Sequence, residues 1–341
     1  MSVNSQAVAV VIPCFRVKKH ILYVVEGIGD EVDYIVVVDD ACPEKSGEFV
    51  LGNCCDARIK VVTHTHNQGV GGAVLTGYRY AAELGAEIMV KLDGDGQMDP
   101  SLIDLFVRPI KSGQADYTKG NRFYNAEDVR TMPPIRLVGN AILSFMTKIS
   151  SGYWTIFDPT NGYTAISTAV FHQLPSHKIQ RRYFFESDML FRLGTIRACV
   201  LDVPMEAVYG DERSGLRISR ILHQFFLRNI ANLCKRIAYN YFLRDFTLAS
   251  IELIVGGSFL VFGVSFGTHQ WVHSISSGVT SSTGTVMLAA LPVILGVQLV
   301  LSFLAFDISA TPNKAIHAML ATKTRLREAV TTQLTAARSP Q

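Results

Sequence analysis

The sequence predicts an α/β domain with a mainly parallel sheet, followed by a basic amphipathic helix and a hairpin of two membrane-spanning helices. Three observations lead to this fold class. Apolar runs of strand character alternate with helical patterns over the first third of the chain, which is typical of a parallel sheet covered by helices. Several of these runs end abruptly in Asp, Asn or Gly. Two long segments in the last third are almost free of charge, as bilayer helices are.

The composition agrees with a chain that lies partly in lipid. Only 18% of the 341 residues are charged and the mean hydropathy is +0.23, an unusual balance for a soluble protein. The formal net charge of +3 is too small to indicate a nucleic-acid partner. The first residues carry no basic stretch, so we expect no signal peptide. The six cysteines lack metal-binding spacing and are expected to be reduced thiols of a cytosolic domain.

Strands and helices are expected in alternation along the first part of the chain. Val, Ile and Tyr favour buried strands, whereas apolar residues three and four positions apart indicate helices. The expected strands are residues 7–12, 34–38, 58–63, 87–92 and 115–119. The expected helices are residues 17–27, 71–84 and 101–111.

The carboxyl ends of these strands form the most informative pattern. Ligands of open parallel sheets bind beyond these ends, and here all five are polar or rich in glycine. The fourth strand ends in Asp93 and Asp95, whose side chains point the same way in an extended chain. Mg²⁺ and Mn²⁺ take one or two carboxylates together with phosphate oxygens. The pair therefore predicts a divalent metal shared with a diphosphate.

Three other phosphate- or metal-binding motifs do not fit the sequence. The glycine-rich run that starts at Gly69 has Val74 where a dinucleotide fingerprint needs its last glycine. No Gly-Lys-Ser/Thr follows, so the P-loop pattern is missing. The run after Asp93 is similar to an EF-hand loop, but Met98 replaces the required glycine and Asp104 the bidentate glutamate.

Five short motifs, in this order, resemble those of the family 2 glycosyltransferases with the GT-A fold. They are VIPCF (11–15), VDD (38–40), NQG (67–69), DGDGQ (93–97) and DPTNGY (158–163). The last two are similar, more narrowly, to the polyprenyl-phosphate glycosyltransferases, which include dolichyl-phosphate mannose synthase and the GtrB-type glucosyltransferases. The resemblance extends over roughly residues 7–220, and the two apolar segments match the GtrB-like members.

The resemblance implies a nucleotide-sugar site at the strand ends. Pro13 would shape the loop under the nucleotide, and Asp39 and Asp40 would bind its base and ribose. Asn67 and Gly69 would belong to the same site. Mg²⁺ or Mn²⁺ would be held on the diphosphate, and would neutralise charge on the leaving group. The implied metal ligands are Asp93, Asp95 and Gln97. The resemblance also implies a catalytic role for Asp95.

Four further residues are implied in catalysis. Arg122 and Arg213 match arginines that contact phosphate, which a planar guanidinium binds with two hydrogen bonds. Arg220, which is not one of these four, stands where the family usually has a lysine. Glu186 and Asp188 lie in the region that supplies a catalytic base in many members. Because a lipid monophosphate is mostly dianionic at neutral pH, we expect these two carboxylates to position the acceptor phosphate or sugar more than to remove a proton.

Residues 249–268 and 286–306 are long and apolar enough to span a bilayer, and the alternative is a pair of buried core helices. Basic residues flank the pair, whereas the connection 269–285 carries no charge. By the positive-inside rule, both termini face the cytoplasm and the connection faces away. Glu252, near the start of the first span, is expected at the interface, or paired with Arg244 or with a neighbouring subunit.

The chain is thus expected to have four parts. Residues 1–215 form the catalytic domain. Residues 216–246 are basic, amphipathic and rich in aromatic side chains, which favours a helix in the headgroup layer over one packed on its own domain. Residues 247–306 form the membrane hairpin and residues 307–341 a cytosolic tail. A hairpin of two spans also favours a homo-oligomer.

Together these observations predict an inverting glycosyltransferase at the cytosolic face of the inner membrane. It would move one hexose from a nucleotide-diphosphate sugar, with UDP-glucose as the expected donor, to polyprenyl (undecaprenyl) phosphate. One alternative is a processive polysaccharide synthase of the same superfamily, although residues 180–183 do not match Gln-x-x-Arg-Trp and two spans cannot alone enclose a polymer path. The other is a non-catalytic membrane scaffold or nucleotide-binding partner.

Overall fold

A computed structural model of the chain describes residues 6–124, 134–206 and 218–323. The chain divides into two compact units. The first unit consists of residues 1–232 and 312–341, and the second of residues 233–311. The first unit is therefore made of two separate pieces of the chain, and the second unit is inserted between them.

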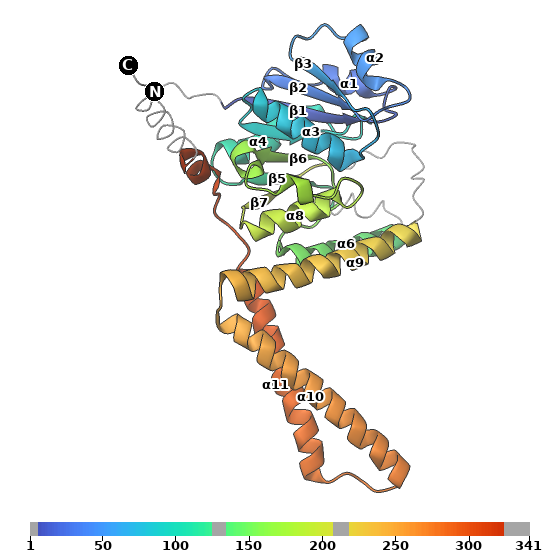
Figure 1. Cartoon of the computed structure of the whole chain (residues 1–341), viewed down its shortest axis with the longest axis vertical. Helices are drawn as coiled ribbons and strands as arrows, with labels where there is room; N and C mark the ends of the chain where they lie inside the picture. The colour runs from blue at the N-terminus through green and yellow to red at the C-terminus, as the bar shows by residue number, and fades with distance from the viewer. Residues whose placement is uncertain (1–5, 125–133, 207–217, 324–341) are drawn as a thin grey trace, which may run out of the picture. The chain divides into compact units, whose positions relative to one another are not determined.

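A seven-stranded sheet runs through the first unit (Figure 1). Its strands lie in the order β3-β2-β1-β4-β6-β5-β7. β6 is antiparallel to both of its neighbours, and the other neighbouring strands are parallel. The mainly parallel α/β fold expected from the sequence is confirmed. In chain order the strands are β1 (Val8–Cys14), β2 (Tyr34–Asp39), β3 (Ile59–Thr63), β4 (Ile88–Lys91), β5 (Tyr117–Asn121), β6 (Thr164–Ser167) and β7 (Val200–Pro204).

The central strand β1 shows why this sheet has helices on both faces. It is buried along almost its whole length. Val8, Val10 and Ile12 belong to one apolar cluster, and Ala9 and Val11 belong to a second. Because successive residues of a strand point to opposite faces, a continuous apolar run suits a strand that is covered on both sides.

The helices of the first unit supply the rest of these two clusters. α1 (Ile21–Glu26) and α4 (Ile103–Lys111) pack into the first cluster. α3 (Val70–Glu83) and α8 (Phe185–Thr195) pack into the second. The remaining helical segments are α2 (Ser46–Asn53), η1 (Pro100–Leu102), α6 (Pro134–Ser151), α7 (Thr168–Phe171), η2 (Ser176–Lys178) and α9 (Ile218–Ile237), inside which the boundary between the units falls.

Strands β6 and β7 were not expected from the sequence. β6 has only four residues, and β7 contains Asp202 and ends at Pro204, so neither gives a clear hydrophobic period. The antiparallel pairing of β6 places its first residue, Thr164, opposite Lys91 at the end of β4. Thr164 also lies opposite Lys119 near the end of β5. The loop before β6 therefore lies where the carboxyl ends of β4 and β5 meet.

The chain that follows the second unit returns to the first unit. Asp116 accepts hydrogen bonds from the backbone N–H groups of Ile316 (2.9 Å) and His317 (2.8 Å), and of Cys199 (2.8 Å). Ile316 and Leu320 pack against the second apolar cluster. Part of the segment expected to be a cytosolic tail thus contributes to the core of the first unit.

Two long helices, α10 (Leu248–Ser277) and α11 (Thr283–Ser309), make up most of the second unit (Figure 1). Both are long and apolar enough to cross a membrane, and both extend beyond the spans expected from the sequence. Only 22% and 11% of their most apolar windows are buried in the structure. A core helix of a soluble protein would be mostly buried, so these two are candidate membrane spans.

The two helices approach each other closely at glycines. A Cβ atom on Gly296 would lie 2.9 Å from the carbonyl oxygen of Gly256, and one on Gly256 would lie 2.9 Å from Leu299 Cβ. Small residues allow helix backbones to come this close. Across the same helix pair, Glu252 accepts a hydrogen bond from Ser302 Oγ (2.8 Å). The partner of this acid, which the sequence left open, lies on the facing helix.

The basic amphipathic segment expected over residues 216–246, of which 218–246 are described, consists of two elements. α9 ends at Ile237 and is followed by a π-helical segment, η3 (Ala238–Arg244). Within the second unit, Arg236 forms a buried bidentate ion pair with Asp307, with N–O distances of 2.6 and 3.0 Å. Tyr241 donates a hydrogen bond to the same carboxylate (2.5 Å). Arg236 and Tyr241 of this segment therefore contact other residues of the protein.

Candidate active site

A cavity of about 590 Å³ opens at the carboxyl ends of β1, β2 and β4. This is the sheet edge at which the sequence predicts ligand binding, and six of the expected site residues lie in its wall. The start of α3 completes one side and residues 182 and 183 another. The lining residues are Pro13, Cys14, Phe15, Val17, Asp40, Asn67, Gly69, Val70, Ala73, Asp93, Gly94, Asp95, Arg182 and Tyr183.

A larger hollow, of about 1110 Å³, follows the outer face of α10 in the second unit. Its lining is mostly apolar, with small polar residues, and the one titratable side chain in it is His269. An open groove of this kind lacks the convergent polar groups of a catalytic site. The candidate active site is therefore the cavity in the first unit.

Asp93 and Asp95 follow β4 on a short, fixed turn. Gly96 has a φ of 77°, a left-handed conformation that favours glycine. Asp95 Oδ1 accepts the backbone N–H of Gln97 (3.0 Å), and the N–H of Asp93 donates to Met98 Sδ (3.3 Å). Both carboxylates line the cavity, whereas Gln97, an expected metal ligand, is not among the lining residues.

A buried lysine lies beside the first of these carboxylates. Lys91 precedes Asp93 by two residues and therefore lies on the same side of the strand. Its Nζ is 2.8 Å from Asp93 Oδ1 and 3.4 Å from Glu186 Oε1, and its side chain is 1% exposed. Burial alone lowers the pKa of Lys91, but the charges of Asp93 and Glu186 outweigh burial and raise that pKa above the usual value. The two carboxylates beside Nζ favour the charged form of Lys91.

The residues present fit a divalent metal if a substrate supplies further oxygens. Asp93 Oδ1 is buried and pairs with Lys91 Nζ, with no further hydrogen-bond partner, so it can take a metal where that ion pair yields. Over residues 6–124, 134–206 and 218–323, no group of three or more His, Cys, Asp or Glu side chains could hold a metal. Mg²⁺ commonly binds one or two carboxylates with phosphate oxygens. Asp93 and Asp95 suit that arrangement, in which a diphosphate completes the ligand set.

Asp40 organises the loop that leads from β3 to α3. Its Oδ1 accepts the backbone N–H of Gln68 (2.8 Å) and lies 2.7 Å from His64 Nδ1, and its Oδ2 accepts the N–H of Gly69 (2.8 Å). Asn67 Nδ2 donates to the carbonyl oxygen of Asp40 (3.3 Å). Asp40 thus holds Asn67 and Gly69 in the cavity wall while it lines the cavity itself.

Asp39 does not reach the cavity, although the sequence assigned it to the nucleotide together with Asp40. Its Oδ1 accepts the N–H of Cys42 and its Oδ2 that of Gly47, both at 2.7 Å. Gly47 lies in the first turn of α2, where backbone N–H groups lack helical partners. Consecutive residues of an extended chain point to opposite sides, so the fold uses Asp39 to hold the start of a helix.

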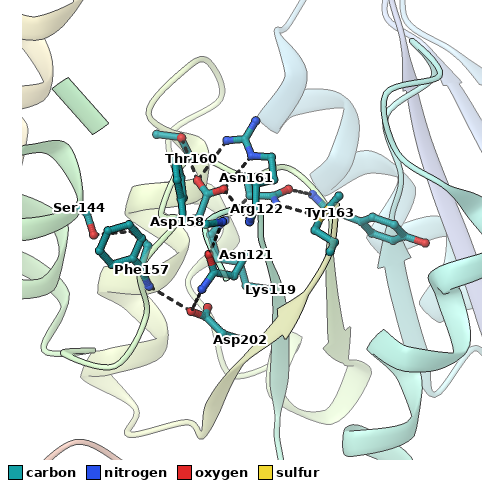
Figure 2. Close-up of polar contacts among 12 residues, drawn as sticks. Lys119, Asn121, Arg122, Ser144, Phe157, Asp158, Thr160, Asn161, Tyr163 and Asp202 are labelled. Carbon is teal, nitrogen blue, oxygen red and sulfur yellow. Dashed lines mark hydrogen bonds and ion pairs between the residues drawn. The ribbon is translucent and has the colours of Figure 1, made fainter. Parts of the chain in front are cut away.

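A second group of polar side chains gathers around the loop before β6 (Figure 2). Arg122 forms a bidentate ion pair with Asp158, with Nε–Oδ2 and Nη2–Oδ1 distances of 2.7 and 3.1 Å. Asn121 Nδ2 donates to Asp202 Oδ2 (2.9 Å), which also accepts the N–H of Phe157 (3.1 Å). Arg122, expected to contact phosphate, is therefore oriented by Asp158; it is not among the lining residues of the cavity.

The same loop connects this polar group with the end of β4. Lys119 is buried and donates a hydrogen bond to the carbonyl oxygen of Asn161. Burial lowers the pKa of Lys119 to about 8. The next residue, Gly162, has no room for a side chain, because a Cβ atom there would overlap Lys91 Nζ and Asp93 Oδ2. The loop backbone therefore lies directly against the Lys91–Asp93 pair.

Glu186 and Asp188 share the first turn of α8 but have different surroundings. Glu186 faces Lys91. Asp188 is 2% exposed, and its Oδ2 accepts the N–H of Gln180 (2.9 Å) and Nε–H of Arg192 (3.0 Å). Neither Asp188 nor Glu186 is among the lining residues of the cavity, and their expected role in positioning the acceptor stays a prediction. Its carboxylate holds the segment that carries the cavity residues 182 and 183.

Arg213, expected to contact phosphate, lies outside the described residues, and so does the side chain of Arg220. Their roles stay predictions from the resemblance.

Sequence reasoning missed three residues of the site: Lys91, Arg182 and Tyr183. A charge inside the apolar run that forms β4 was the available signal for Lys91, because a buried strand rarely carries an unpaired lysine. Arg182 and Tyr183 give no such signal. They reach the cavity because residues 180–182 pack on the start of α3, where Gly72 N–H donates to Arg181 O (3.1 Å).

The fold and the cavity agree with the comparison to known families. Residues 9–174 match the family described as Glycosyl transferase family 2. This chain contains a family 2 glycosyltransferase domain. The matched range holds nearly all of β1 to β6 and both carboxylates that follow β4. The resemblance seen in the sequence motifs, and the expectation of a glycosyltransferase, are thereby confirmed.

Several named relatives align with the glycosyltransferase domain. The chain is 29% identical over 215 residues to the UDP-N-acetylglucosamine--dolichyl-phosphate N-acetylglucosaminyltransferase of Methanococcus voltae, covering 59% of this chain and 85% of that protein. It is 27% identical to the undecaprenyl-phosphate mannosyltransferase of Micrococcus luteus (51% and 71% covered). It is 26% identical to the polyprenol monophosphomannose synthase of Mycolicibacterium smegmatis (59% and 77% covered). All three names combine a sugar with a polyprenyl or dolichyl lipid.

Solved structures of a glucosyl-3-phosphoglycerate synthase from Mycobacterium tuberculosis share the fold. One, in complex with Mn²⁺, UDP-glucose and phosphoglyceric acid, has a TM-score of 0.51 at 18% identity and covers 68% of this chain and 79% of that one. Another, with Mg²⁺ and UDP, has a TM-score of 0.51 at 19% identity with the same coverage. At this identity the likeness shows the fold alone, and it confirms the GT-A-like architecture.

Proposed function

We propose that this glycosyltransferase moves one hexose from a nucleotide-diphosphate sugar to polyprenyl phosphate, with inversion at the anomeric carbon. The observation that carries the proposal is the cavity at the sheet edge, in which Asp93 and Asp95 lie beside Asp40 and the loop of Asn67 and Gly69. The relatives support the acceptor, because each name contains a polyprenyl or dolichyl lipid.

For the donor we propose a uridine-diphosphate sugar, with UDP-glucose as the first candidate. The relative from Methanococcus voltae is named for UDP-N-acetylglucosamine, and the fold neighbour from Mycobacterium tuberculosis was solved with UDP-glucose. Two relatives are named for mannose, which makes mannose the main competing sugar.

The proposed reaction needs no general base. A lipid monophosphate is mostly dianionic near neutral pH, so one of its oxygens can attack the anomeric carbon directly. As the new C–O bond forms, the bond to the diphosphate oxygen breaks, and the nucleoside diphosphate leaves with the electron pair. A divalent metal, when bound by Asp93 and Asp95, would neutralise charge on this leaving group. Arg122, oriented by Asp158, would bind a phosphate group of a substrate.

We also propose that α10 and α11 cross the inner membrane as a hairpin, with both termini and the catalytic domain in the cytoplasm. Support comes from their length, their low burial and the uncharged connection between basic flanks. The bilayer would then hold both the enzyme and its lipid acceptor. The lipid-facing surfaces of the hairpin would also allow contacts between copies of this chain in a homo-oligomer.

A defined set of reactions tests this function. Full-length protein in nanodiscs is incubated with short-chain polyprenyl phosphate, Mn²⁺ or Mg²⁺, and UDP-glucose, UDP-N-acetylglucosamine or GDP-mannose. We expect one sugar per lipid phosphate and an equal amount of nucleoside diphosphate by mass spectrometry, with both lost in EDTA. Asp95→Asn should lower turnover at least about 100-fold, whereas Asp104→Asn, an exposed carboxylate of α4 paired only with Arg108, should keep it.

Three other outcomes would reject the proposal, each for a different reason. A polymer on the lipid, or without it, would identify a processive synthase. Nucleotide binding without turnover of any donor would identify a non-catalytic nucleotide-binding partner. Sugar transfer that is unaffected by removal of polyprenyl phosphate would exclude this acceptor.

A further inference from the structure

The buried lysine of β4 has no role in the reaction as described so far. Lys91 is among the largest fully buried side chains of the protein. A buried ammonium group is unfavourable unless it is paired. Its two partners come from different elements, Asp93 at the end of β4 and Glu186 in α8. Lys91 therefore links one proposed metal ligand with a carboxylate that a different element supplies.

The contact between Lys91 and Asp93 is a close ion pair with little further support. The Nζ–Oδ1 distance is 2.8 Å, and neither buried atom has a further hydrogen-bond partner in the described structure. A buried ion pair offsets the cost of its burial only when additional hydrogen bonds satisfy the remaining lone pairs and protons. Both atoms are thus suited to a change of partner, Oδ1 toward a metal and Nζ toward Glu186.

The surroundings of Lys91 favour a change of ion-pair partner over a movement of the lysine side chain out of the site. Gly162 is buried and lies so close that a Cβ atom would overlap both Lys91 Nζ and Asp93 Oδ2. The strand that carries Lys91 is enclosed between β1 and β6. The second carboxylate, Glu186, is only 3.4 Å from Nζ in the structure, so a small shift of the ammonium group completes that ion pair.

We propose that Lys91 is a built-in cation that competes with the divalent metal for Asp93 and moves to Glu186 when the metal binds. Without metal, Lys91 neutralises Asp93 and keeps the Asp93 and Glu186 carboxylates together. With metal, Glu186 compensates the displaced ammonium group. Lys91 and Glu186 are positioning residues in this scheme, and the scheme rests on the metal use assumed in the proposed function.

The competition makes metal binding depend on the nucleotide. A metal that arrives alone has to displace Lys91 from Asp93 with few protein oxygens in return. A metal that arrives with a nucleoside diphosphate brings phosphate oxygens as ligands, which offset the displacement. The site should therefore bind metal weakly by itself and much more tightly with the donor or with UDP.

Mn²⁺ binding measures this directly. Free Mn²⁺ is titrated by electron paramagnetic resonance against full-length protein in detergent, without nucleotide and with saturating UDP. In Lys91→Met, which removes the charge and keeps a long unbranched side chain, Mn²⁺ alone should bind at least about tenfold more tightly than in the natural protein. The gain from UDP should shrink by a similar factor.

Glu186→Gln provides the matched control, because it removes the carboxylate that receives Lys91. It should weaken binding of Mn²⁺ alone at least about tenfold. In the Lys91→Met background the same substitution should have a clearly smaller effect, since no ammonium group needs a second partner. Equal effects in the two backgrounds would mean that Glu186 acts only as a distant charge, and this would overturn the exchange.

Unchanged or weaker binding of Mn²⁺ alone by folded Lys91→Met, with folding checked by thermal unfolding, would also overturn the proposal. If Lys91→Met does not fold, the Glu186→Gln variant tests the proposal instead. Binding of Mn²⁺ to Glu186→Gln that is unchanged or tighter than in the natural protein would reject the proposal. None of these measurements contains a lipid acceptor. Failure of sugar transfer to polyprenyl phosphate, with the Mn²⁺ shifts intact, would therefore reject only the acceptor assigned above.

Discussion

Gly162 is a residue of the site with little room for a side chain. An added Cβ atom would overlap Lys91 Nζ and Asp93 Oδ2, so Gly162→Ala should push the pair apart. We expect kcat/KM for the donor to fall about tenfold or more, because a misplacement of about 1 Å in a site can cost about 100-fold in rate. Steady-state kinetics measure this. Gly52→Ala, where the new methyl group meets nothing, is the control, and equal kinetics of both variants would contradict the prediction.

Asp202 makes the stability of the fold depend on pH. Burial raises the pKa of its carboxyl to about 6, against opposing hydrogen bonds from Phe157 N–H and Asn121. Between about pH 4 and 6 the folded protein retains a proton that the unfolded chain has released. The free energy of unfolding should therefore decrease as pH rises through this window, by about 2–3 kcal/mol in total. Thermal unfolding at pH 4.5 and 7.5 should show this loss in the natural protein relative to Asp202→Asn, and parallel pH profiles would disprove it.

At the scale of elements, the glycines of α10 and α11 decide how closely the two helices pack. A side chain on Gly296 would meet the backbone of Gly256, whereas Gly257, one residue further along α10, has open space at its Cβ position. Gly296→Val should destabilise the helix pair by about 1–3 kcal/mol, and Gly257→Val should not. Thermal unfolding in detergent compares them, and an equal loss in both would refute packing as the cause.

Elements with a strong apolar pattern were those that the sequence predicted well. β1 to β5 lie within two residues of the expected strands. β1, β2 and β4 are runs of buried, mostly apolar residues before a polar end. β6 and β7 were missed because four residues of mixed polarity, and a strand interrupted by Asp202, carry no readable period. These two strands form because the fold pairs them with strands that are distant in the sequence.

The same contrast holds for the site. Asp93 and Asp95 lie in the cavity wall, where the sequence placed them, and their role as metal ligands stays a prediction. Asp39 and Asp188 do not line the cavity, because the contacts of a carboxylate depend on which N–H groups the fold brings to it. For Asp39 that group is Gly47 N–H, eight residues away, and for Asp188 it includes Gln180 N–H.

At the scale of the whole molecule, the proposed topology can be tested without activity. If α10 and α11 span the membrane, residues 269–285 lie on the side opposite both termini. A cysteine at Val279, which is exposed, should react with a membrane-impermeant maleimide added outside cells, after the natural cysteines are replaced. A cysteine at Ser2 should react only after permeabilisation. The reverse pattern, or equal labelling, would exclude this orientation.

The division of the first unit into two pieces of chain limits how the enzyme can be shortened. Ending the polypeptide after residue 232 would remove Ile316 and Leu320 from the second apolar cluster and strip Asp116 of its partners at residues 316 and 317. A water-soluble version should instead splice residue 232 to residue 312 through a flexible linker. This removes the hydrophobic hairpin as one piece, and the first unit keeps residues 312–341.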